Sequence, residues 1–278
     1  MRLKINRAIA GYIMAGIVML CVFLYFRFPG EALTDYAKAA AAARYPQLLL
    51  SIDATKPAFP PGMAFENVTA SPDGRPEATL HADSLRIRPG GISLLGGRLS
   101  LLMAAEGYGG EAKGRIDFAR LFSLQGPLTA GVNFRDIRIE KCTWLRETLA
   151  HPITGTLKGT VSFNATAETL KNGTGSIDFT LTNGVYQLLE SFLGIEKIDF
   201  SKIEGKASFR NGALKITQLT LTGEKLRCSL KGDILLADDF RDSRIDINGT
   251  VEIPMPNNNR RVTLTISGTI GNPQTRFM

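Results

Sequence analysis

Beyond Pro46 the sequence alternates between apolar and polar residues with few interruptions, and this alternation is the strongest constraint on its fold. Successive side chains of a β-strand point to opposite faces, so a period of two predicts strands with one apolar and one polar face. Residues 203–236 show the pattern most clearly. It recurs over residues 157–165, 177–182, 245–253 and 262–270. We therefore expect a mainly β protein, built as an antiparallel sheet with one apolar face.

Turn residues predict the register of two of these strands. Asn211-Gly212 is the strongest short hairpin signal, because a type I′ turn requires positive φ at both central residues. A two-residue turn at this point pairs Phe209 with Leu214 and keeps both on the apolar face. The next leucines are one residue out of phase with this pattern, so we expect a β-bulge at Thr217 or Gln218.

A second tight turn is expected at Gly223-Glu224, because glycine suits the first central position of a type II′ turn. Such a turn would pair Leu221 with Leu226. Residues 203–236 would then form a three-strand unit that presents one continuous apolar face.

Two segments depart from the alternation, and both are expected to be short helices that cover the sheet. Residues 186–200 place apolar side chains at helical spacing, and Gly194 would end this helix as its C-cap. Residues 142–150 form the second candidate helix. Each helix would shield part of the apolar face from water.

A large one-sided sheet cannot stay flat and open, so it must curl, close or receive a cover. We expect a curled, twisted antiparallel sheet that forms a groove or half-barrel, bent at glycines such as Gly159 and Gly205. The residues predicted to line the groove are Phe163, Phe179, Phe209, Leu214, Ile216, Leu226 and Leu230. A filled barrel or sandwich core would produce the same alternation, and the sequence leaves both possibilities open.

Residues 8–26 carry no charged side chain and are long enough to cross the hydrocarbon core as a helix. Basic residues precede this segment, so the positive-inside rule places the N-terminus in the cytoplasm and the rest of the chain across the membrane. The predicted anchor positions are Ala8, Ile13, Ile17, Leu20, Phe23 and Phe26. A cleaved signal peptide is the alternative, but its apolar region is usually shorter than this one.

The chain is therefore expected to have three parts. Residues 1–28 form a cytoplasmic tip and a transmembrane anchor. Residues 29–46 are rich in alanine, the best helix former, and form a helical stalk that ends at Pro46. Residues 47–278 form the antiparallel β domain.

The sequence holds no recognisable catalytic motif and no phosphate-binding glycine loop, so we expect neither enzyme activity nor a cofactor. His81 and His151 have no further ligand at metal-site spacing, so no metal is expected. Cys142 and Cys228 are either a disulfide or two separate core thiols. The net charge of +7 favours anionic partners such as phospholipid headgroups. Nucleic acid is not an expected partner, because no aromatic residues stand among the outward basic ones.

Residues 198–236, "IDFSKIEGKASFRNGALKITQLTLTGEKLRCSLKGDILL", resemble the C-terminal part of AsmA-like proteins. These are inner-membrane-anchored proteins of Gram-negative envelopes with curled β-groove folds. The ending "LTISGTIGNPQTRF" is similar to their terminal strand and the turn after it. The earlier segment "FPPGMAFENVTA" resembles the Pro-Pro-Gly segment of the type II secretion system protein N family. That family shares the fold, the single anchor and this overall length.

The resemblance implies a role in the inner-membrane platform of type II secretion, with other secretion subunits as partners. The AsmA-like relatives imply instead the binding or transfer of lipid, with phospholipid acyl chains lying in the groove. Both hypotheses place the chain in the bacterial inner membrane as a single-pass protein with its bulk in the periplasm. A strand length of roughly 17 to 20 Å suggests that the groove is too short to join two membranes by itself.

Overall fold

The computed structural model contains a single sheet of 15 strands, in which strands that follow one another in sequence are neighbours from β3 to β15. Every pairing is antiparallel. The residues that the structure describes are 11–12, 14–16, 19, 23, 27–59, 61–72, 79–91, 93, 97–120, 123–149, 152–166, 172–192, 195–237, 239–254 and 260–277. The prediction of a mainly β, antiparallel fold is confirmed.

The strands are β1 (Leu48–Ser51), β2 (Ala54–Ala58), β3 (Gly62–Pro72), β4 (Leu80–Pro89), β5 (Leu99–Gly107), β6 (Gly110–Arg120), β7 (Ser123–Arg138), β8 (Thr156–Thr166), β9 (Thr174–Phe192), β10 (Ile195–Arg210), β11 (Ala213–Thr222), β12 (Arg227–Leu235), β13 (Arg244–Ile253), β14 (Arg260–Thr269) and β15 (Asn272–Phe277). The helical elements are α2 (Gly30–Arg44), η1 (Ile139–Lys141), α4 (Thr143–Leu149) and η3 (Phe240–Asp242). The sheet is open, because β1 and β2 both pair with β3 at one end and β15 pairs only with β14 at the other.

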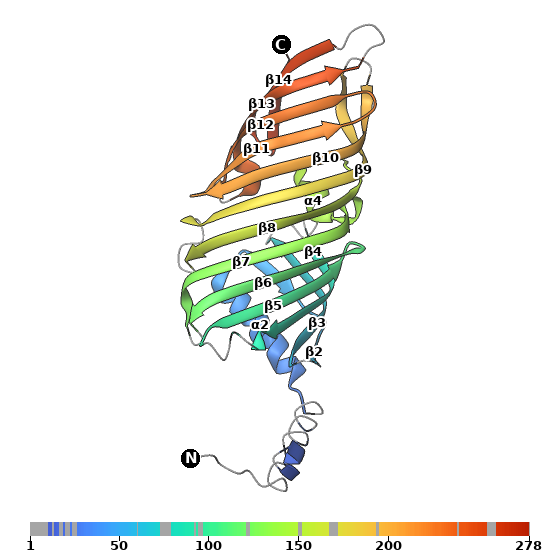
Figure 1. Cartoon of the computed structure of the whole chain (residues 1–278). Coiled ribbons are helices and arrows are strands. Elements are labelled where there is room, and N and C mark those ends of the chain that lie inside the picture. Colours follow the sequence, from blue (N-terminus) through green and yellow to red (C-terminus); the bar gives the residue numbers. More distant parts are fainter. Residues whose placement is uncertain are drawn as a thin grey trace.

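The sheet twists and curls as it rises from α2 at its N-terminal end to β15 (Figure 1). Helices α2 and α4 lie on the same side of it, behind the front strands in this view. Neighbouring strands are about 4.8 Å apart, so the path from β1 to β15 is roughly 60 Å long. The sheet is therefore much longer across its strands than along them.

The Asn211-Gly212 hairpin has the predicted geometry. Asn211 has a φ of 51° and Gly212 a φ of 77°, as a type I′ turn requires. Phe209 pairs with Leu214, and the register shifts after Lys206 so that Thr217 is left without a partner. The Thr217 hydroxyl donates a 3.0 Å hydrogen bond to the carbonyl of Lys206, which fixes the predicted bulge.

The predicted tight turn at Gly223-Glu224 is wrong. Leu221 pairs with Cys228, so residues 223–226 form a longer turn closed by a 2.9 Å bond from Gly223 N to Leu226 O. Leu226 is 6% exposed in this turn, and its burial in the core favours the longer loop. The pairing differs from the prediction by two residues, and a shift of two keeps the same side chains on the apolar face.

The predicted helix over residues 186–200 is also wrong. Residues 186–192 continue β9 and residues 195–200 begin β10, with Tyr186 paired to Ile198 and Val185 to Asp199. Gly194, the predicted C-cap, lies outside the described residues. Asn183 adopts a φ of 52° inside β9, at the start of this extension. The backbone groups of the two strands hydrogen bond to each other. This pairing stabilises the extended conformation in spite of the helical spacing of the apolar residues. The other predicted covering helix is confirmed as α4.

Residues 30–44 form the predicted helix, but it packs against the first strands of the sheet. The hydroxyls of Thr34 and Thr55 lie 2.6 Å apart, and each residue is 7% exposed. Among the described residues, no helix is long and apolar enough to cross a membrane. Of the predicted anchor positions only Phe23 is described; Ala8, Ile13, Ile17, Leu20 and Phe26 lie outside the described residues. The membrane anchor therefore stays a prediction.

Candidate ligand-binding face

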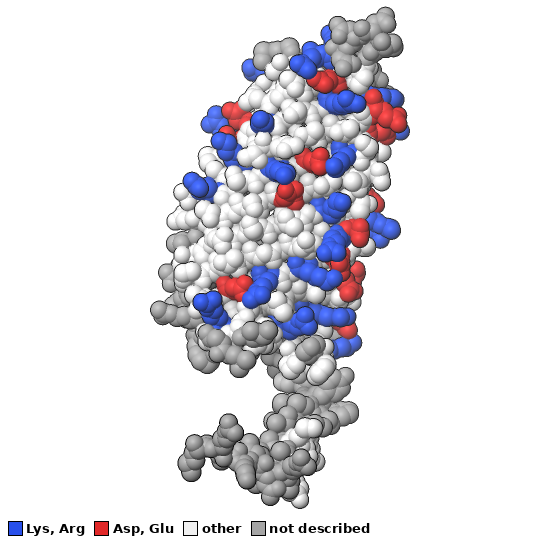
Figure 2. Space-filling view, viewed as in Figure 1, with Lys and Arg blue, Asp and Glu red and all other residues white. Residues whose placement is uncertain are grey.

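Rows of paired residues run across the strands and give the sheet two different faces. We define the apolar face by one row, in which each residue pairs with the next: Leu101, Ile116, Ala130, Phe163, Gly175, Phe209, Leu214, Ile234 and Ile245. The polar face is defined by the adjacent row: Leu102, Arg115, Gly131, Ser162, Ser176, Ser208, Lys215, Asp233 and Asp246. Figure 2 shows the polar face, with charged side chains distributed over it.

The structure places all of the predicted lining residues on the apolar side, but their environments differ. Phe163, Phe179, Phe209, Leu214 and Ile216 are only partly buried. Leu230 is 9% exposed and Leu226 6% exposed, within a cluster that also contains Ile247, Val251 and Leu264. Leu226 and Leu230 therefore belong to a packed core, and Ile216 packs against it, whereas the other four residues are outside both buried clusters and remain partly exposed to solvent.

Aromatic rings on the apolar face lie over glycines of the neighbouring strands. Phe163 of β8 and Phe209 of β10 both pair with Gly175 of β9, and their ring centroids are 5.7 Å apart. A Cβ at Gly205 would lie 2.2 Å from the Phe179 ring. The sequence predicted only a bend at Gly205 and no role for Gly175. Their position opposite a phenylalanine on a paired strand was the signal for this contact.

Coverage of the apolar face changes along the sheet. In β4 to β8, no apolar side chain among the described residues is fully buried. In β9 to β14 the buried residues form two clusters, one around Leu181 and Phe200 and the other around Val251. Ile198, from the extension of the β9–β10 hairpin, packs against the second cluster. This hairpin is therefore part of the cover over the C-terminal strands.

A contact between two aromatic rings bridges the apolar face. α4 follows β7 at one end of the strands. η3 follows β12 at the other end of the strands, because successive antiparallel strands reverse direction. The rings of Trp144 and Phe240 from these two connections nevertheless lie 5.9 Å apart. Leu145 of α4 packs against the cluster of Leu181 and Phe200, so the contact passes over the apolar face. The sequence contained no signal for this long-range contact.

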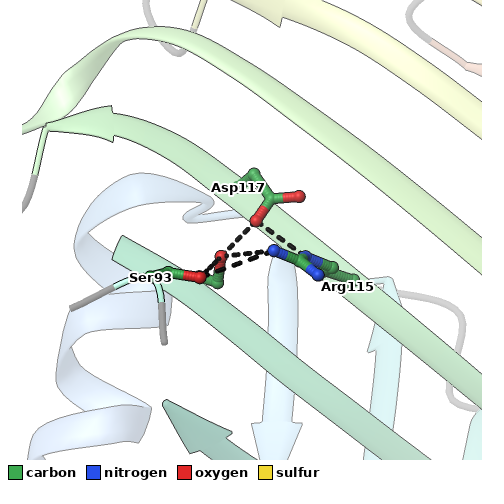
Figure 3. A network of polar contacts seen from close by, with 4 residues as sticks. Ser93, Arg115 and Asp117 are labelled. Atoms are coloured by element: carbon green, nitrogen blue, oxygen red, sulfur yellow. Dashed lines mark hydrogen bonds and ion pairs between the residues drawn. The ribbon is translucent and has the colours of Figure 1, made fainter. Parts of the chain in front are cut away.

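The polar face carries a compact network of polar contacts where β5 begins and β6 ends (Figure 3). Ser100 is 2% exposed, and its Oγ lies 2.8 Å from Ser93 Oγ and within hydrogen-bonding distance of Asp117. Arg115 donates to Ser100 at 3.0 Å and to Asp117 at 2.8 Å. The network fastens the connection between β4 and β5 to the sheet.

Two opposing effects act on the pKa of Asp117. Partial burial on its own would raise this pKa, but hydrogen bonds from Ser100 and Arg115 and the charges of Arg115 and Arg98 lower it overall. Asp117 is therefore a stably ionised carboxylate whose contacts are structural.

Cys142 and Cys228 are both free thiols, so the alternative of a disulfide between them is wrong. Burial raises the pKa of Cys228 to about 11, which keeps it a neutral thiol within the apolar cluster. Within the described residues, no group of three His, Cys, Asp or Glu side chains is placed to hold a metal ion.

Comparison with known proteins found no family model, no curated protein and no solved structure that matches this chain. The resemblance to AsmA-like proteins and to the type II secretion system protein N family therefore stays a prediction from the sequence.

Proposed function

We propose that this chain is a non-enzymatic, single-pass protein of the bacterial inner membrane, with its N-terminus in the cytoplasm and its β domain in the periplasm. Its curled sheet forms a half-barrel groove whose apolar face holds the acyl chains of phospholipids. One observation carries the proposal: β4 to β8 present an apolar face in which no described apolar side chain is fully buried. An apolar surface that its own chain buries only in part is typical of a binding site.

The chemistry of the apolar face suits an acyl chain better than a compact ligand. The row of paired residues that defines the apolar face contributes Leu101, Ile116 and Phe163 in β4 to β8, and none of these residues is charged. Burial of a methylene is worth about 0.8 kcal/mol, so a chain laid across several strands gains affinity from length alone. The part of the face in β4 to β8 runs across the strands for roughly 19 Å, since each of the four steps between neighbouring strands adds about 4.8 Å.

Photo-crosslinking of the full chain tests this proposal. The chain is placed in nanodiscs that contain a phospholipid with a diazirine group on its acyl chain, and the crosslinked residues are mapped by peptide mass spectrometry. We expect adducts at Ile116 and Phe163 and none at the adjacent polar-face residues Arg115 and Ser162. Phe163→Glu should remove the adducts, whereas Ser162→Glu should leave them unchanged. Adducts confined to residues 8–26, or equal on both faces, would contradict the proposal.

Assembly within the type II secretion platform is the second candidate, and the open end of the sheet favours it. All six residues of β15 are exposed, and this strand pairs only with β14. An unpaired strand edge is a template for a strand from another protein. We expect Thr275→Pro to weaken copurification with secretion subunits and to lower secretion, while the lipid crosslinks stay unchanged. Normal secretion by a folded Thr275→Pro variant would count against this role.

A further inference from the structure

The turn between β2 and β3 presents the most exposed large apolar side chain of the described residues. Phe59 is 96% exposed, just beyond the last residue of β2. The hairpin is closed by the pairing of Ala58 with Gly62, and Pro57 and Pro61 restrict its backbone. A single exposed apolar residue is common on protein surfaces, so Phe59 gains meaning only from its surroundings.

This turn lies at the end of the sheet nearest the predicted membrane anchor. Gly30, the first residue of α2, is packed so closely on β2 that an added Cβ would lie 2.4 Å from the carbonyl oxygen of Thr55. Residues 27–29 connect this point to the apolar segment 8–26. From Thr55 the strand continues directly to Phe59, a span of about 13 Å at the rise of an extended strand. Figure 1 shows β2 at the same end of the sheet as the start of α2.

Two arginines flank the same turn. A Cβ at Gly62 would lie 3.2 Å from the Cα of Arg88, so Arg88 borders the hairpin directly. Arg86 pairs with Ala64, which lies two residues after Gly62 in β3. Both arginines are exposed, and within the described part of the chain neither forms an ion pair. Figure 2 shows basic side chains, with acidic ones among them, over the lower strands of the polar face.

We infer that the β2–β3 turn is a membrane-contact site, in which Phe59 enters the bilayer interface and Arg86 and Arg88 bind anionic lipid headgroups. Phenylalanine is among the apolar residues that interfacial segments bury at the boundary between headgroups and acyl chains. Basic residues near the surface are attracted to anionic lipid. This inference rests on the proposed membrane anchor. It adds a second point of contact, which would hold the N-terminal end of the apolar face against the lipid.

A tryptophan placed at the turn reports directly on its environment. The chain has one tryptophan, so Trp144→Phe provides a background without this fluorophore. The test variant is Phe59→Trp in that background, and the matched control is Tyr36→Trp on α2, where Tyr36 is 73% exposed. Both full-length variants are placed in nanodiscs of phosphatidylcholine, with or without phosphatidylglycerol and with or without acyl-chain bromination.

We expect the tryptophan at position 59 to emit at shorter wavelength than the control and to be quenched severalfold more by the brominated lipid. In the same background, Arg86→Gln with Arg88→Gln should reduce this quenching only in discs that contain phosphatidylglycerol. Equal, water-like emission from positions 59 and 36 in disc-bound chains would overturn this inference and leave the anchor in place. Chains that remain outside the discs would overturn the anchor and this inference together.

Discussion

Strands β4 to β8 and strands β9 to β14 follow the same alternating pattern, yet they pack differently. In the first region the described apolar side chains are at most partly buried, whereas the second contains Leu181, Phe200, Leu230 and Val251 in packed clusters. The difference comes from what lies over the apolar face. In the second region the extended β9–β10 hairpin and α4 cover it. Alternation therefore fixes which side chains share a face, and the connections decide whether that face becomes a core.

Matched leucine truncations in the two regions should produce the largest difference. Leu181 is 4% exposed in β9, so Leu181→Ala should lower the free energy of unfolding by about 2–5 kcal/mol. Leu101 of β5 is only partly buried, so Leu101→Ala should cost about 1 kcal/mol or less. Thermal and urea unfolding of the full chain in detergent would measure both. Equal losses would mean that the face of β4 to β8 is covered in solution.

A glycine near the boundary between the regions should show the next largest effect. A side chain at Gly205 would meet the Phe179 ring, so Gly205→Ala should force the ring aside and cost about 1–3 kcal/mol. Gly131→Ala is the matched control, because no atom lies within 4 Å of its added Cβ. We expect the control to be close to neutral in the same unfolding assay. An unchanged free energy of unfolding in Gly205→Ala would show that the Phe179 ring can move away from position 205 without loss of stability.

Local sequence signals predicted the parts of this fold that local geometry determines. The positive φ values of Asn211 and Gly212 follow from their residue types, and the bulge at Thr217 follows from the phase of the apolar residues around it. The placement of Phe163 and Phe209 on the apolar face also followed from alternation. Each of these features depends on residues close together in the chain.

The failures all involve contacts between distant residues. Residues 186–200 have helical spacing, but pairing between β9 and β10 extends residues 186–192 and 195–200, and Ile198 reaches the cluster of β12 and β13. The contact between Trp144 and Phe240 joins connections at opposite ends of the strands, and no periodic pattern in the sequence predicts it. The division between an uncovered and a covered apolar face depends on these contacts, so alternation alone could not reveal it.

The Trp144–Phe240 contact allows a more local test of the cover. Phe240→Ala should cost about 0.5–1.5 kcal/mol, the usual worth of an aromatic pair, and should shift the emission of Trp144 to longer wavelength. Leu235→Ala is the control, since Leu235 is 59% exposed at the end of β12. It should change neither stability nor emission. Unchanged emission in Phe240→Ala would indicate that η3 does not shield the ring and that other residues provide the cover.

The smallest effect is expected on the polar face of the uncovered region, where the Asp117 network contributes contacts. The pKa of Asp117 in the folded chain lies below its usual value of 3.8, so ionised Asp117 stabilises the fold above that pH. This contribution is lost as the pH falls through the lower, folded-state pKa. Its side chain is 41% exposed, so solvent screening keeps the contribution small.

Asp117→Asn should therefore lower Tm slightly at neutral pH, and its difference from the wild-type chain should narrow as the pH falls below the usual pKa of 3.8 and through the lower pKa of the folded chain. Asp178→Asn is the control, because the bond of Asp178 to Lys206 is an exposed 3.4 Å ion pair between β9 and β10. Such a pair contributes little, so its removal should leave Tm nearly unchanged. Thermal melts monitored by circular dichroism would measure both differences. A Tm difference for Asp117→Asn that stays constant with pH would show that the amide disturbs the β4–β5 connection by its shape, and that the carboxylate charge does not stabilise this region.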